Sequence, residues 1–318
     1  MEREERAFPS SSGLCSIHTI IWYPDSSIYN QPVGVIQIAH GMIDHIERFE
    51  EMAEYFADKG FVVAGNDHLG HGESVNSEDD YGYFAKGSHG ADYLIKDMHR
   101  LTRIMKKMYK DIPYILIGHS MGSFMARKYA CVYGDELDGV IFLGTGNQSK
   151  ALVNTGLGLS YIARCVRGER YRSKVLNKMM FGAYNSHIKD NRTDNDWLTK
   201  DTKIVDAYVN DPKCSYAFTA NGYIGFFNVI KYDINEKNIA KTPADLPVLF
   251  ASGEEDPVGN YGKAVKKIFK LYTKYVDNVE LRLYEDDRHE LHSETNRQEV
   301  FDDLLEWIKS NTCSFKTT

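Results

Sequence analysis

A Gly-x-Ser-x-Gly pattern at residues 118–122, with Ser120 at its centre, follows the apolar segment 112–117 and precedes a helix-compatible stretch, 123–133. A sharp turn between a strand and a helix exposes a serine hydroxyl, which a neighbouring base can then activate as a nucleophile. Glycines fit such a turn because a strained backbone leaves no room for Cβ atoms. The pattern also arises by chance in glycine-rich turns, but its place between strand and helix favours a nucleophilic serine.

Apolar segments of strand length alternate with amphipathic segments of helix length on both sides of this turn. In the segment 45–59, apolar residues recur at the helical spacing i, i+3, i+4, i+7, and Gly60 is a natural C-terminal stop. We expect strands at 15–23, 33–39, 61–64, 112–117, 139–144, 246–250 and 279–284, and helices at 45–59, 91–110, 123–133, 261–275 and 298–309. This alternation predicts the α/β class, with a mainly parallel sheet covered by helices on both faces.

The alternation stops near Gly146 and resumes at Leu246. The interval of roughly 100 residues is far longer than an ordinary connection. It contains apolar stretches of its own, at 152–166, 179–181 and 216–230. We therefore expect a core formed by 1–146 and 241–318, and a helical cap, 147–240, inserted over the C-terminal edge of the sheet.

Composition excludes several classes of function. The net charge of −7 argues against a nucleic-acid partner. The charged N-terminus lacks the apolar segment of a secretory signal, and no run approaches the roughly 18 apolar residues of a membrane span. Five scattered cysteines fit a reducing, cytoplasmic compartment better than a disulfide framework. They are Cys15, Cys131, Cys165, Cys214 and Cys313.

Two further patterns resemble parts of ligand sites. His68-x-x-His71 is half a metal site without Cys, Asp or His partners at suitable spacing, and residues 144–146 lack the third glycine of a dinucleotide-binding turn. We therefore expect no cofactor and no metal. Composition and pattern leave the oligomeric state open.

An activated serine needs a base, and the base needs an orienting acid. In sheets of this type the three residues run Ser, Asp or Glu, then His along the chain, on loops at one edge of the sheet. Asp256 and His289 follow the expected strands 246–250 and 279–284 in that order. Glu254 and Glu255 are alternatives to the acid, and His292 to the base.

The intermediate of such a reaction carries an oxyanion that needs backbone N–H donors. One donor is expected from the residue after the nucleophile, Met121, and the other from the loop after an early strand. His40-Gly41-Met42 follows the expected strand 33–39. The N–H of Met42 is therefore the second candidate, although the same residues also fit a plain glycine turn.

Four segments together are similar to the monoglyceride lipase and lysophospholipase group of α/β-hydrolases, which is related to the serine aminopeptidases. They are AHGMIDHIERFEEMAEYFADKGFVVAGNDHLGHGES at 39–74, LIGHSMGS at 116–123, LPVLFASGEEDP at 246–257 and DRHELHSE at 287–294. The resemblance covers most of the chain, and the cap segment 196–220 resembles bacterial lysophospholipase-like members. One departure is Ser123, where relatives usually carry a third glycine, and it affects the fine shape of the turn.

The resemblance implies an α/β-hydrolase fold with Ser120 as nucleophile, Asp256 as acid and His289 as base. It also implies that Met42 and Met121 provide the oxyanion donors and that Val258 faces an acyl tunnel. The loop 66–72 matches a structural loop of the family.

The apolar cap favours esters of single-chain lipids, such as monoacylglycerol or lysophospholipid. Two alternatives stay open: amide or aminopeptidase chemistry with the same three residues, and a binding protein that kept the fold without catalysis. The cap also gathers basic residues against Glu169 alone, which indicates either a solvated helix face or peripheral contact with an anionic membrane. They are Arg164, Arg167, Arg170, Arg172, Lys174 and Lys178.

Overall fold

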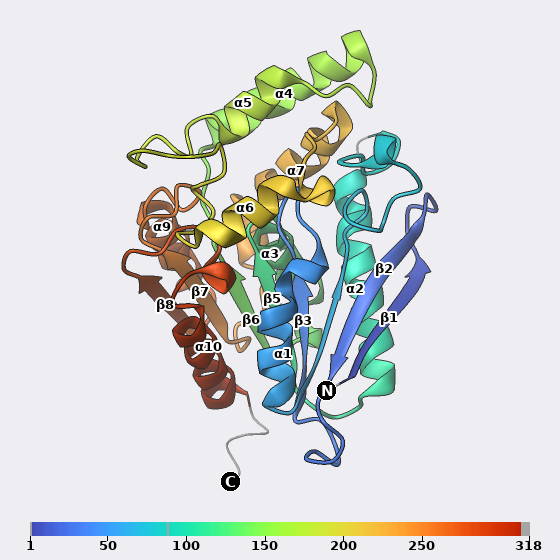
Figure 1. The fold of residues 1–318 in the computed structure, drawn as a ribbon, viewed down its shortest axis with the longest axis vertical. Helices are drawn as coiled ribbons and strands as arrows, with labels where there is room; N and C mark the ends of the chain where they lie inside the picture. Colours follow the sequence, from blue (N-terminus) through green and yellow to red (C-terminus); the bar gives the residue numbers. More distant parts are fainter. Residues whose placement is uncertain (1, 88, 313–318) are drawn as a thin grey trace.

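The fold is built on one sheet of eight strands (Figure 1), seen in a computed structural model that describes residues 2–87 and 89–312. The strand order is β1-β2-β4-β3-β5-β6-β7-β8. β1 and β2 pair antiparallel with each other, β2 pairs antiparallel with β4, and every other pairing is parallel. The strands are β1 (Glu2–Pro9), β2 (Ser16–Tyr23), β3 (Gly34–Ala39), β4 (Phe61–Asn66), β5 (Tyr114–His119), β6 (Gly139–Leu143), β7 (Val248–Gly253) and β8 (Val279–Tyr284).

Helices cover both faces of this sheet, because successive side chains of a strand point to opposite faces. On β5, Ile115 and Ile117 join an apolar cluster with α1 and α10, whereas Tyr114 and Leu116 join a second cluster with α2, α3 and α9. These helices are α1 (Glu50–Asp58), α2 (Gly90–Met108), α3 (Met121–Tyr133), α9 (Lys263–Tyr272) and α10 (Arg297–Asn311). The mainly parallel α/β-hydrolase sheet predicted from the sequence is confirmed.

Five helices separate β6 from β7, in the interval for which the sequence predicts an inserted cap. They are α4 (Lys150–Arg167), α5 (Lys174–Phe181), α6 (Thr202–Asn210), α7 (Ala220–Asp233) and α8 (Glu236–Ile239). Figure 1 shows α4 and α5 at the end of the molecule opposite the C-terminal end of α10, with α6 and α7 between them and the sheet. The boundaries at 147 and 240 stay a prediction.

The cap helices begin at residues suited to that position. Ser149 and Ser173 accept hydrogen bonds from the N–H groups of Leu152 and Leu176, and Thr219 does the same at α7. Such caps satisfy N–H groups that have no partner inside the helix. No helix in the described ranges is long and apolar enough to cross a membrane.

Candidate active site

Ser120 occupies the turn between β5 and α3 with φ 52° and ψ −119°. A positive φ is strained for a residue with a side chain, by about 1–3 kcal/mol. The flanking glycines are required by space: a Cβ on Gly122 would collide with the carbonyl oxygen of Ala39, and one on Gly118 with that of Gly122. The Ser120 N–H donates to the Leu143 carbonyl oxygen at 2.9 Å, which ties the turn to β6.

Ser123, the departure from the family pattern, fits this turn. Its side chain is buried, and its Oγ donates a hydrogen bond to the carbonyl oxygen of Ser120 at 2.6 Å. The hydroxyl therefore has a partner inside the turn and fastens the first turn of α3 to the serine.

Asp256 and His289 meet at the same edge of the sheet, after β7 and β8. His289 Nδ1 lies 3.0 Å from Asp256 Oδ1, and the two side chains are 1% and 0% exposed, in that order. The Val258 N–H donates to the same carboxylate oxygen at 2.8 Å, and Ser252 Oγ donates to Oδ2 at 3.2 Å. The carboxylate is therefore fixed from three sides.

The alternatives to this pair lie elsewhere. Glu254 and Glu255 are exposed. His292 is buried and stacks on Phe49 with ring centroids 4.1 Å apart, and burial lowers its pKa to about 4. Within the described part of the chain, neither ring nitrogen of His292 has a hydrogen-bond partner.

Ser120 and His289 line one cavity, although no hydrogen bond joins their side chains in the described residues. The Nε2 atom of His289, the one opposite Asp256, has no partner there. Two rings flank the imidazole, since Trp197 and His119 have their centroids 4.9 Å and 4.8 Å from it. Catalytic hydrogen bonds are often long in substrate-free enzymes and shorten when substrate binds.

The loop that carries Met42 packs against Ser120, because a Cβ on Gly41 would lie 3.3 Å from the Ser120 Cβ. The Gly41 N–H donates to Asp44 Oδ2 at 3.1 Å, and Arg48 binds Asp44 at 2.8 Å and Glu290 at 2.6 Å. Burial alone would raise the pKa of Asp44, but the Arg48 guanidinium and the nearby rings of His40, His45 and His119 together outweigh it and hold that pKa far below its usual range. This buried charged group fixes the loop.

Sequence reasoning missed these charges and Trp197. Asp44 and Arg48 are four residues apart in the chain, just before α1, which is a local signal. Glu290 lies 242 residues from Arg48, and no spacing rule connects them. Trp197 comes from the cap, and its place over His289 depends on how the cap folds back.

Two cavities meet at Ser120. The larger, of about 670 Å³, is lined by polar residues that include Asp44, Asn177, Asn185, Asn195, Tyr208 and Glu290. The smaller, of about 330 Å³, is lined by apolar residues that include Leu152, Val153, Met179, Met180, Phe226 and Val258. Both also include Met42, Phe181 and Trp197. The serine therefore stands between a more polar compartment of mixed lining and a mainly apolar one.

The sequence matches a known protein family over most of its length. Residues 30–296 match the family model described as serine aminopeptidase, S33. The chain belongs to this family. In the S33 family it is similar to the monoacylglycerol lipase of Mycolicibacterium smegmatis, with 26% identity over 97% of this chain and 98% of that protein. It is also similar to human monoglyceride lipase, with 24% identity over 93% of this chain and 88% of the human protein.

A solved structure shows the same fold along nearly the whole chain. The thermostable carboxyl esterase from Bacillus coagulans, crystallised with glycerol, has a TM-score of 0.90 and 27% identity, covering 98% of this chain and 99% of the esterase. The predicted resemblance to the monoglyceride lipase group is confirmed, and the chain is a carboxylic-ester hydrolase.

Proposed function

We propose that this S33-family chain hydrolyses esters of single-chain lipids, monoacylglycerol or lysophospholipid, through a covalent acyl-enzyme. The observation that carries the proposal is the position of Ser120 at the junction of the polar and the apolar cavity. An ester whose acyl chain fills one compartment and whose alcohol fills the other has its carbonyl at this junction.

In the proposed reaction, Ser120 Oγ attacks the ester carbonyl while His289 Nε2 takes its proton. Asp256 holds the imidazole through Nδ1 and stabilises the imidazolium. The N–H groups of Met42 and Met121 bind the oxyanion. His289 then gives the proton to the leaving alcohol and activates a water molecule, which releases the fatty acid and restores Ser120.

The two compartments support the choice of substrate. Each methylene of an acyl chain that leaves water contributes about 0.8 kcal/mol, and the smaller cavity offers Val258, Phe226 and both Met179 and Met180 as its lining. The larger cavity offers carboxylate, amide and hydroxyl groups to a hydroxylated or zwitterionic alcohol. The relatives named as monoacylglycerol lipases give independent support for the glycerol ester.

A substrate panel tests the proposal. We expect hydrolysis of p-nitrophenyl esters to rise from short to medium and long acyl chains, and turnover of monoacylglycerol or lysophosphatidylcholine. Ser120→Ala should lower kcat by on the order of 10³ or more. Cleavage of aminoacyl p-nitroanilides in preference to esters would instead support aminopeptidase chemistry. A folded protein that a fluorophosphonate probe fails to label at Ser120 would support the binding protein.

We further propose that the outer face of α4 and α5 contacts a membrane surface. The two helices expose Leu152, Leu159, Ile162, Val166 and Val175, each 36–72% accessible. Two of the basic residues of the cap, in the linker between α4 and α5, are used internally: Arg170 pairs with Asp80 at 2.8 Å, and Arg172 donates to the carbonyl oxygen of Ala217 at 2.6 Å. The apolar residues therefore carry more of the expected binding than the charges do.

Liposome co-sedimentation tests this face. We expect wild-type protein to bind vesicles, with Ile162→Glu plus Val166→Glu reducing the bound fraction several-fold. The double variant should keep hydrolysing a dissolved short-chain ester. Equal binding by both proteins would exclude this face as the contact.

A further inference from the structure

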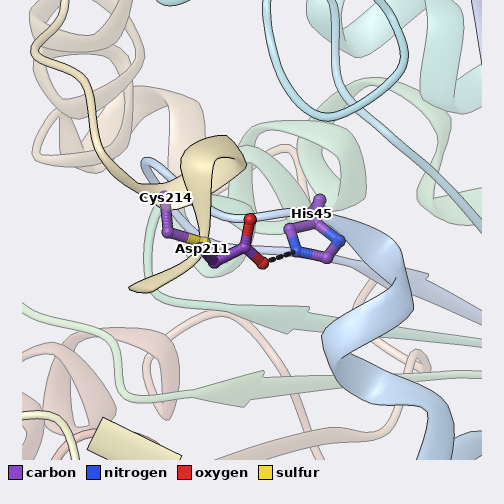
Figure 2. A group of neighbouring side chains, drawn as sticks. All are labelled: His45, Asp211 and Cys214. Carbon is purple, nitrogen blue, oxygen red and sulfur yellow. Dashed lines mark hydrogen bonds and ion pairs between the residues drawn. The ribbon is translucent and has the colours of Figure 1, made fainter. Parts of the chain in front are cut away.

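His45, Asp211 and Cys214 come together where the cap meets the core. His45 lies in the loop between β3 and the 3-10 turn η1 (Ile46–Phe49), while Asp211 precedes and Cys214 ends the 3-10 turn η4 (Pro212–Cys214). Figure 2 shows the three side chains meeting between these two segments. His45 Nε2 lies 2.8 Å from Asp211 Oδ2, and one nitrogen, one oxygen and one sulfur atom all lie within 4.8 Å of one another.

We propose that these three side chains bind one zinc-class divalent ion that fastens the cap to the core. Imidazole nitrogen, carboxylate oxygen and thiolate sulfur are the ligand types that zinc takes in proteins. In the described part of the chain, this is the one group of at least three His, Cys, Asp or Glu residues with such spacing.

The three side chains need only small movements to reach zinc-binding distances. With zinc bonds of about 2.0–2.3 Å, tetrahedral ligand atoms lie about 3.3–3.6 Å apart. His45 and Asp211 would therefore separate by about half an ångström from their hydrogen-bonded distance, and Cys214 would approach them by no more than about 1.5 Å. Cys214 lines the larger cavity, from which a water molecule can complete four ligands.

The surroundings carry an excess of negative charge. Asp44, Asp211 and Glu290 act electrostatically on Cys214, as does the guanidinium of Arg48, which pairs with Asp44 and Glu290. A cation is therefore attracted to this junction more than an anion is. The ion displaces the thiol proton of Cys214 when it binds, as zinc does at other thiols.

The position gives the ion a clear mechanical effect. His45 follows Met42 by three residues, and η4 belongs to the cap segment between α6 and α7. One ligand, His45, comes from the core, and two, Asp211 and Cys214, come from the cap. The ion would therefore cross-link segments 166 residues apart in the chain. Neither the catalytic proposal nor the membrane proposal depends on this ion.

Metal titration of the full chain tests the site directly. The protein is stripped with a chelator, dialysed and mixed with zinc sulfate or cobalt chloride. We expect one zinc to be retained per chain, a rise in Tm with zinc, and the near-ultraviolet sulfur-to-cobalt charge-transfer band of a thiolate ligand. These readouts do not use activity, so they separate this proposal from the proposed ester hydrolysis.

Matched variants locate the ion. Cys214→Ser should abolish the cobalt band, and both Cys214→Ser and His45→Gln should weaken zinc binding at least tenfold. The amide introduced by His45→Gln can still donate to Asp211, which keeps the cap contact and hence the fold. His18 pairs with Asp67 at 2.9 Å without a described thiol ligand, so His18→Gln is the matched control and should bind zinc normally. Exposed Cys165→Ser is the second control.

Three results would overturn the proposal. They are less than stoichiometric zinc on the wild-type chain, equal zinc affinity in wild type, Cys214→Ser and His45→Gln, and loss of the cobalt band in Cys165→Ser but not in Cys214→Ser.

Discussion

The Nδ1 atom of His289 lies 3.0 Å from the Oδ1 atom of Asp256, between residues 33 positions apart that follow neighbouring parallel strands. The contact is buried, and the Val258 N–H holds the same oxygen. The carboxylate therefore favours the tautomer of His289 with its proton on Nδ1, and Nε2 has no hydrogen-bond partner among the described residues.

Asp256→Asn should lower kcat by about 10³–10⁴ with little change in fold, because an amide at this position stabilises the wrong imidazole tautomer. Steady-state hydrolysis of a p-nitrophenyl ester measures the change. Glu255→Gln, at an exposed neighbour, is the control and should act like wild type. An Asp256→Asn enzyme with wild-type kcat would remove Asp256 from the mechanism.

Ser123→Gly should destabilise the protein by about 1–2 kcal/mol, because it removes one buried hydrogen bond and adds backbone freedom to the helix. Ser123→Ala separates the two effects, since it removes only the hydroxyl. Urea denaturation measures both variants. We expect kcat within a few-fold of wild type, and a large loss of activity in Ser123→Ala would show that the hydroxyl shapes the nucleophile turn.

Arg127→Met should destabilise by about 2–4 kcal/mol, because buried carbonyl groups would lose a charged donor. Arg127 on α3 is buried and donates to the carbonyl oxygens of Gly146 at 2.8 Å and Asp233 at 3.1 Å, near both ends of the cap segment. Arg127→Lys keeps the positive charge but not the planar guanidinium that reaches both carbonyl groups, so it should lower the free energy of unfolding by less. Hydrogen exchange should rise first at those two ends, and uniform exchange would argue against this role.

Acid should destabilise the fold as the pH falls below about 6.5. Burial lowers the pKa of His40 to about 3 and those of His71 and His292 to about 4, and it lowers those of His68 and His119 too. The unfolded chain therefore binds more protons than the native one below about pH 6.5. Each such histidine lowers the free energy of unfolding by up to about 1.4 kcal/mol for each unit that the pH falls.

Three carboxyl groups act in the opposite direction. Burial raises the pKa of Asp233 to about 8 and that of Asp287 to about 6, and it also raises the pKa of Asp97, so their protonation favours the native state as the pH falls. Five histidines outweigh three carboxyls, and the net stability should fall from about pH 6.5 to about pH 4.5. Urea unfolding across this range measures it, and His292→Leu should flatten the slope. A stability that is constant or rises on acidification would contradict the assignment.

Local pattern predicted most of the elements but not β1. Strands and helices with apolar periodicity appear within a few residues of their expected bounds, because burial on the sheet imposes that periodicity. β1 (Glu2–Pro9) consists mainly of charged, exposed residues, since an edge strand buries little and its pairing with β2 relies on backbone hydrogen bonds. Its sequence therefore carries no apolar signal.

The candidate site divides in the same way. The loops of Ser120, Asp256 and His289 could be placed because each follows a recognisable strand. Contacts between cap and core, such as Trp197 over His289, could not, because they depend on the path of a long insertion. The same holds for His45 and Cys214, because they are too far apart in the chain for a spacing rule to relate them. Cys313 lies outside the described residues.

The left-handed backbone of Ser120 restricts which residues evolution can place there. Threonine carries the same hydroxyl, yet a β-branched side chain is severely disfavoured at a φ of 52°. Cysteine and alanine have no such branch. The backbone torsion angles thus limit which residues can replace Ser120, whatever their reactivity. A directed-evolution library at position 120 should therefore return cysteine but not threonine among active clones.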